Sequence, residues 1–249
     1  MTTLANGTPL NSRPGATTRG ARLFYLIMAL AITATVVFGF TLNVSRARFA
    51  FADLPPLVHL HAGLCMLWIA LFVAQSGLIV AGSVGRHRIL GWAGAVLAIA
   101  LVVTGVAVTV ACLQRGAVPP FFPPSLFLVM DVLGVLAFFV LTASAVALRR
   151  RSEWHRRLMV CGTVVLMAPA VARILPMPAL GPLGGWLVTG VLIAFVLAGV
   201  GHDLLTRRRA HAAWFVGLLT ILFIQVMTPL IAFSGPVIKL TANLLGVRG

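Results

Sequence analysis

The stretch ILGWAGAVLAIALVVTGVAVTVAC, residues 89–112, is 24 residues long and contains no charged side chain. The hydrocarbon core of a bilayer is about 30 Å thick, and a helix needs about 20 apolar residues to cross it. Because lipid offers no hydrogen-bond partners, each backbone amide of such a stretch must be paired within the helix itself. Residues 89–112 therefore predict a membrane-spanning helix.

Six further stretches have the same character. The 249-residue chain is 60% hydrophobic and 9% charged, with a mean hydropathy of +1.07, which excludes a water-soluble domain. None of the stretches has the ten-residue alternation of a β-barrel strand. The sequence predicts an all-α integral membrane protein, a bundle of seven transmembrane helices at about 23–43, 57–81, 89–112, 125–148, 157–175, 182–201 and 213–234.

The predicted domain organisation has three parts. Residues 1–21, rich in Thr, Asn, Ser, Gly, Pro and Arg, predict a disordered cytoplasmic tail. Residues 22–234 make up the seven-helix membrane domain. Residues 235–249 predict a short outer C-terminal tail.

The basic residues are distributed unevenly over the two ends of the predicted helices. Of the 19 Arg and Lys residues, 13 fall on the side of the N-terminus, Arg157 among them, and 5 on the other side, with Arg173 inside the fifth span. This predicts a cytoplasmic N-terminus and an outer C-terminus. The net charge of +15 lies in short clusters between apolar stretches, which favours the lipid bilayer as a partner over nucleic acid.

Four of the six histidines fall near the predicted cytoplasmic face: His87, His155, His202 and His211. One interpretation is anchoring, because His, Arg and Trp residues such as Trp214 are common at the level of the headgroups. The other is cofactor binding, since two imidazoles from neighbouring helices at one depth can hold a b-type haem or a transition metal. The sequence leaves both interpretations open.

A second polar group lies toward the predicted outer face. His59 and His61 begin the second span, and two residues so spaced are about 200° apart on a helix, so they cannot flank one haem. Asp131 lies about two turns into the fourth span and Arg173 near the end of the fifth. Because an unpaired charge within a span is costly, we expect these two to pair and to share a polar cavity with His61.

Three motifs carry a resemblance. HLHAGLCMLW (59–68), HRILGW (87–92) and HRRLM (155–159), the last followed by AVAR (170–173), resemble a bacterial family of multipass membrane proteins without an assigned reaction. The resemblance covers about residues 55–175 and implies that the characteristic positions of that family are His59, His61, His87, His155 and Arg173.

A looser resemblance concerns haem. The histidines at helix ends resemble those of haem-binding membrane bundles such as the b-type cytochromes and relatives of haem A synthase, which implies a haem-binding bundle. The chain lacks paired outer histidines on separate helices, which argues against a second bis-histidine haem.

Three functions are compatible with the sequence. The first is a haem- or metal-binding membrane protein that transfers electrons, with quinone or another membrane protein as partner. The second is a transporter or small-molecule binding protein that uses the outer His, Asp and Arg residues, and the third is a structural or assembly subunit without catalysis. A retinal pigment is excluded because the only lysine, Lys239, lies beyond the last span.

Overall fold

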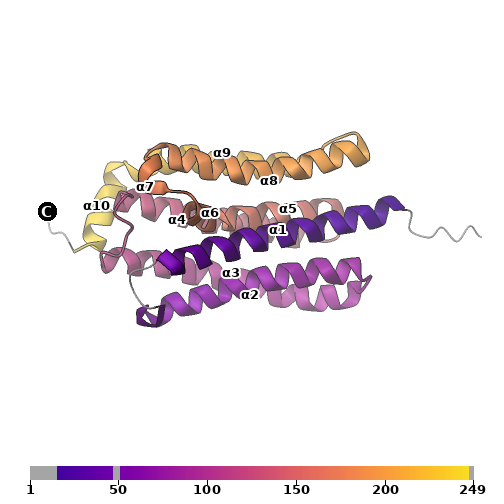
Figure 1. Cartoon of the computed structure of the whole chain (residues 1–249), viewed down its shortest axis with the longest axis horizontal. Helices are drawn as coiled ribbons and strands as arrows, with labels where there is room; N and C mark the ends of the chain where they lie inside the picture. The colour runs from indigo at the N-terminus through magenta and orange to yellow at the C-terminus, as the bar shows by residue number, and fades with distance from the viewer. Residues whose placement is uncertain (1–15, 47–50, 247–249) are drawn as a thin grey trace, which may run out of the picture.

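A computed structural model describes residues 16–46 and 51–246, and within these residues every regular element is helical (Figure 1). This confirms the all-helical class expected from hydropathy. In chain order the elements are α1 (Ala16–Arg46), the 3-10 turn η1 (Phe51–Asp53), α2 (Pro56–Val80), α3 (Val84–Gln114), α4 (Pro124–Ala147), α5 (Ser152–Leu166), α6 (Ala168–Ile174), α7 (Met177–Leu180), α8 (Leu183–Arg207), α9 (Ala212–Ala232) and α10 (Gly235–Leu244).

Six of the described helices are long and apolar enough to cross a membrane: α1, α2, α3, α4, α8 and α9. Each of them overlaps one of the seven predicted spans, with ends that differ by at most seven residues. The remaining predicted span, 157–175, corresponds to two shorter helices, α5 and α6, whose axes differ by 44°. Pro169 lies in the first turn of α6 and has no N–H, so the hydrogen-bond ladder of α5 cannot continue through it.

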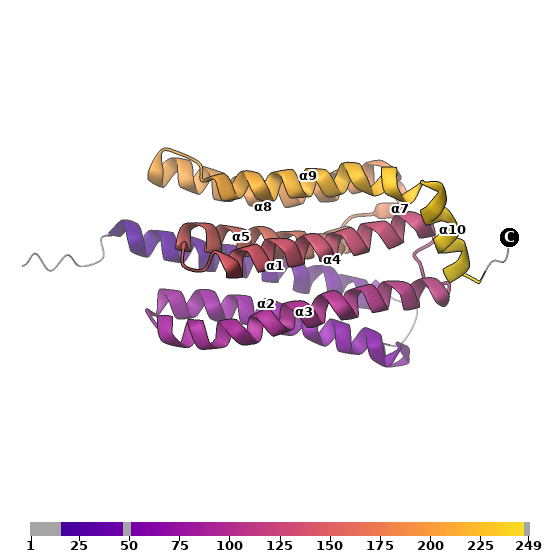
Figure 2. The same cartoon turned by 180° about the vertical axis from the view of Figure 1, so that it is seen from behind.

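The helices run alternately in opposite directions, so the connections collect at two ends of the bundle (Figures 1 and 2). One end carries the α2–α3, α4–α5 and α8–α9 connections and most of the arginines, and we call it the arginine-rich end. The opposite end carries proline-containing segments before α2, α4 and α8, and we call it the proline-rich end. Pro56 and Pro124 open α2 and α4, where the missing N–H would have no helical partner.

Helix α5, which has 15 residues, is enclosed by its neighbours. In Figures 1 and 2, α8 and α9 form one layer, α2 and α3 form the opposite layer, and α1, α4 and α5 lie between them. Eight of the 15 residues of α5 are buried, on all sides of the helix. Arg157, a polar residue in the second turn of α5, is therefore buried inside the bundle, where it needs partners.

Both predicted tails differ from the structure where it describes them. Helix α1 begins at Ala16, so residues 16–21, expected in a disordered tail, are helical, and residues 1–15 lie outside the described part. Most of the expected outer tail folds as α10, which lies across the proline-rich end (Figure 2). The side chain of Thr241 is buried there, so α10 packs on the bundle.

Candidate functional site

His87 and His155 lie side by side at the arginine-rich end. His87 is in the first turn of α3 and His155 in the first turn of α5. Their ring centroids are 6.1 Å apart, and the ring planes are inclined at 81°. Both side chains are half-buried. Two of the four histidines expected in one layer thus form a close pair.

The hydrogen bond of His155 defines its protonation pattern. Nδ1 of His155 lies 2.8 Å from the carbonyl oxygen of Ala145, at the end of α4. A carbonyl oxygen only accepts, so Nδ1 carries the proton and Nε2 of the neutral ring keeps its lone pair. Metal-bound histidines are commonly oriented by such a hydrogen bond to the backbone. Nδ1 of His87 is buried and has no hydrogen-bond partner among the described residues.

His202 has separate surroundings on the side of α1. Its ring stacks on Phe24, with centroids 3.9 Å apart and planes within 14° of parallel. Tyr25 also lies against it, at a centroid distance of 6.5 Å. Aromatic contacts with α1 thus hold the His202 ring, although its Nδ1, like that of His87, is buried without a hydrogen-bond partner among the described residues.

His211 is the N-cap of α9. Its Nδ1 accepts a hydrogen bond from the amide of Ala213 at 3.1 Å, and its ring lies edge-on to Trp154 with centroids 5.0 Å apart. Burial, followed by the nearby Arg157 charge, lowers the pKa of His211 below its usual value of about 6.5. The neutral ring that the cap requires is thus favoured. His202 and His211 have contacts of their own, so each needs no shared metal to explain its position.

A metal ion bound by side chains alone would need three or more ligating side chains close together. Within residues 16–46 and 51–246, no group of three or more His, Cys, Asp or Glu side chains is arranged to hold a metal ion. A metal at His87 and His155 would therefore take its other ligands from a cofactor or solvent.

A buried ion-pair cluster, which the sequence analysis missed, joins three helices at the arginine-rich end. Arg157 of α5 donates from Nε to Oδ2 of Asp203 at 2.8 Å and from Nη2 to Oδ1 at 2.5 Å. Nε1 of Trp214 donates to the same carboxylate at 2.9 Å, and the amide of His211 donates at 3.2 Å. Arg157, Asp203 and Trp214 are all 0% exposed. Headgroup anchoring, one of the two interpretations left open by the sequence, therefore does not apply to Trp214, and Arg157, counted on this side for the orientation, is buried as well.

Glu153 extends this cluster toward the surface. Its carboxylate accepts from Arg157 Nη1 at 2.6 Å, from Arg156 Nη2 at 2.7 Å and from Arg207 Nη2 at 2.9 Å. A signal for the cluster was present in the sequence. Two of the only four acidic residues, Glu153 and Asp203, occur within arginine clusters at the ends of predicted spans.

The histidines at the proline-rich end of the bundle lie in α2. His61 Nδ1 lies 2.9 Å from Oγ1 of Thr104, whose hydroxyl donates to the carbonyl of Ala100 at 2.7 Å. That hydroxyl proton is already used, so His61 Nδ1 donates and Nε2 accepts from the thiol of Cys65 at 3.5 Å. His59 is half-buried in the first turn of α2, where its amide donates to the carbonyl of Pro55.

Asp131 and Arg173 do not form the expected ion pair. No nitrogen of Arg173 lies within 4.0 Å of the Asp131 carboxylate in the described structure, where the ion pairs are those of Glu153 and Asp203. Asp131 accepts from Oγ1 of Thr109 at 3.3 Å. Arg173 instead donates to the carbonyl of Pro169 at 2.8 Å and lies 4.5 Å over the ring of Phe40.

His61 and Asp131 both face helix α3. Thr104 and Thr109 are their respective partners, and the Thr109 hydroxyl also donates to the Gly105 carbonyl at 2.9 Å. A Cβ on Gly105 would lie 3.3 Å from the His61 ring, so the small residue allows that ring to approach. The structure therefore gathers His61 and Asp131 along α3, while Arg173 packs against α1.

Comparisons of this chain with protein-family models, with curated proteins and with solved structures gave no match.

Proposed function

We propose that this chain is a seven-span membrane protein that binds one b-type haem between His87 and His155 and transfers electrons. The supporting observation is the pair of imidazoles, with centroids 6.1 Å apart and the Nε2 lone pair of His155 left available. In this proposal α5 and α6 together form one broken span. The excess of basic residues at the arginine-rich end favours a cytoplasmic N-terminus in a bacterial inner membrane.

The distance between the two rings is compatible with both side chains holding one haem. The Ala145 carbonyl would hold the His155 ring in the tautomer that binds through Nε2. Nδ1 of His87 is buried without a hydrogen-bond partner among the described residues, and the backbone of Gln75 lies within hydrogen-bonding reach of the same ring.

The donor set favours haem over a metal ion held by side chains alone. Two imidazoles complete the coordination of an iron whose other four ligands come from the porphyrin. A tetrahedral zinc site would need three or four protein ligands, and the described residues offer no such group. The haem would supply one-electron redox chemistry, and quinone or another membrane protein would be its electron partner.

The experiment that tests the haem site is an optical spectrum of the purified protein, oxidised and reduced, after expression with added haem precursor. We expect a Soret band in the wild type and loss of most of it in His87→Ala and in His155→Ala. Imidazole added to the His87→Ala protein should restore part of the band, which separates ligand loss from misfolding. His202→Ala is the matched control and should keep its haem, because His202 packs on Phe24 instead.

A wild type without a Soret band, or two ligand variants with full haem content, would contradict the haem proposal. Anchoring at the membrane interface would then be the better account of His87 and His155.

A second candidate function is transport or binding of a small molecule at the proline-rich end. The observation that favours it is Asp131, a carboxylate inside a span that accepts one hydrogen bond, from Thr109, and makes no ion pair within 4.0 Å in the described residues. Ionisable residues within spans commonly line water-filled paths or substrate sites.

The native cysteines test this second candidate. Cys65 is hydrogen-bonded to His61 and is partly exposed, whereas Cys161 is fully buried. If an aqueous cavity reaches His61, a membrane-impermeant thiol reagent should label Cys65 from the outer side and leave Cys161 unmodified. Equal inertness of the two thiols would rule out such a cavity.

A further inference from the structure

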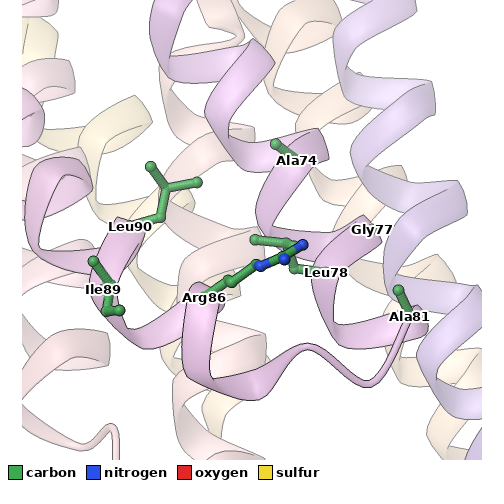
Figure 3. Close-up of a pocket in the computed structure, with 7 residues that line it drawn as sticks. All are labelled: Ala74, Gly77, Leu78, Ala81, Arg86, Ile89 and Leu90. Atoms are coloured by element: carbon green, nitrogen blue, oxygen red, sulfur yellow. The ribbon is translucent and has the colours of Figure 1, made fainter.

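A groove of about 610 Å³ lies between α2 and α3, close to the turn that joins them (Figure 3). Its walls are apolar and come from Ala74, Gly77 and Leu78 of α2, from Ala81 directly after α2, and from Ile89 and Leu90 of α3. Arg86 is the one charged residue that lines it. Ile89 is 77% exposed, so this side of α3 faces outward from the bundle.

The groove results from small residues on one stripe of α2. Ala74, Gly77 and Ala81 are spaced three and four residues apart, so they lie on the same side of the helix. A Cβ added to Gly77 would meet no atom within 4 Å. The stripe from Ala74 to Ala81 is about 10 Å long at a rise of about 1.5 Å per residue. The groove is thus apolar and lies on the outside of the bundle, where it extends along α2 from the turn toward the middle of the helix.

Arg86 lies at the end of this channel nearest the turn. In Figure 3 its side chain reaches from α3 toward Gly77 and Leu78 of α2. No acceptor for its guanidinium is found among the described residues, in contrast to Arg149, which donates to the carbonyl of Val146. A guanidinium offers five N–H donors and binds phosphate oxygens well.

We propose that this groove binds an anionic phospholipid of the leaflet at the arginine-rich end, with its phosphate on Arg86 and an acyl chain along the apolar wall. Charge and shape both support this occupant. The guanidinium lies at the end where headgroups would lie, and the apolar channel continues from it in the direction of the hydrocarbon core. Arg86, Ile89 and Leu90 define a side of α3 roughly 100° from His87, so the lipid site does not depend on haem binding.

Native mass spectrometry of the full chain tests the site, with phosphatidylglycerol and phosphatidylcholine as the two probes. We expect phosphatidylglycerol to be retained in preference to phosphatidylcholine. Arg86→Gln should weaken its retention about five-fold, the effect of one basic residue near a membrane surface. Arg88→Gln is the matched control, because Arg88 is an exposed arginine of the same turn that does not line the groove. Equal losses in the two variants would overturn the proposal in favour of a general attraction to anionic lipid.

A second pair of variants tests the apolar channel separately from the charge. Gly77→Leu places a side chain in the groove, where its Cβ meets no atom within 4 Å, and should weaken phosphatidylglycerol retention. Gly63→Leu is its control, since Gly63 lies on the same helix, also has no atom within 4 Å of an added Cβ and is away from the groove. Full retention in Gly77→Leu would overturn the proposal. Displacement of the lipid by inorganic phosphate would also overturn it, because the site would then be one for a free anion.

Discussion

Arg157 and Asp203 face each other inside the bundle although 46 residues separate them in the chain. Two nitrogens of the guanidinium donate to the two oxygens of the carboxylate, and the side chains are 0% and 1% exposed. Trp214 donates to the same carboxylate from α9. One buried carboxylate therefore joins α5, α8 and α9 at the arginine-rich end.

Asp203→Ala should destabilise the protein by about 3–5 kcal/mol, because it leaves the Arg157 charge buried and without its main partner. The double variant Arg157→Met with Asp203→Leu should recover part of that loss, since an apolar pair removes both charges together but leaves Nε1 of the buried Trp214 without its acceptor. Thermal unfolding in detergent measures both effects. Glu153→Gln is the control and should cost less, because the Glu153 side chain is 36% exposed. A loss below about 1 kcal/mol in Asp203→Ala would show that the pair does not hold the helices together.

Gly199→Ala should destabilise the protein by about 1–3 kcal/mol, the usual cost of overpacking. A Cβ on Gly199 would clash with the ring of Trp214, which is fully buried and tied to Asp203, so the ring cannot move aside freely. Gly201→Ala on the same helix is the matched control, because a Cβ there meets nothing within 4 Å. Midpoints of thermal unfolding compare the two variants. Equal midpoints would mean that α8 and α9 pack less closely than described.

The stability of the protein should fall as the pH is lowered below about 6.5, partly through His211. Burial and the Arg157 charge lower the pKa of His211 in the folded state, while Glu153 and Asp203 act in the opposite direction and Arg207 lowers it further. Below about pH 6.5 the imidazole of this residue binds a proton more readily in the unfolded chain than in the folded protein, so protonation favours unfolding. Above that pH the ring is neutral in both states, and the stability that depends on the neutral ring is fully present.

His211→Asn isolates this effect, because asparagine also caps a helix but does not titrate. The wild type should lose more thermal stability than His211→Asn between about pH 7.5 and 5.5. Equal losses in the two proteins would show that the His211 pKa is not lowered.

Labelling of introduced cysteines should place the two ends of the bundle on opposite sides of the membrane. In a protein without its three native cysteines, Arg150→Cys reports the arginine-rich end and Ala117→Cys the proline-rich end. Both positions are exposed. An impermeant reagent should label Ala117→Cys in intact cells and Arg150→Cys only in inverted vesicles. Labelling of both from one side would contradict the seven-span topology.

Much of the fold could be predicted from single segments of the chain. Residues 89–112 predict a helix because an apolar stretch in lipid can pair its amides only internally, and α3 contains that stretch. Pro56 and Pro124 mark helix starts for a similarly local reason, since a proline lacks the N–H that a first turn leaves unused. The break before α6 also follows from one residue, Pro169.

The sequence also identified histidines and charged residues as candidates for the site, but it did not predict which groups they contact. His87 and His155 were expected at one depth, and the structure places them 6.1 Å apart. His202 and His211 were expected in the same layer, yet Phe24 and the amide of Ala213 are their partners. Asp131 and Arg173 agree in sign and depth, but they do not pair, because Arg173 packs against α1 and Asp131 against α3.

Hydropathy and charge, which are properties of single segments, by themselves determined where the helices lie in the chain and which of their ends share a side. Tertiary structure alone decided that α5 is enclosed by its neighbours and that Arg157 is therefore buried against Asp203. The physical reason is that an apolar helix has no polar face, so its sequence does not indicate which side of the helix faces the other helices. Its neighbours and its rotation are set by close packing at residues such as Gly199 and Trp214, and this contact exists only once helices distant in sequence have come together.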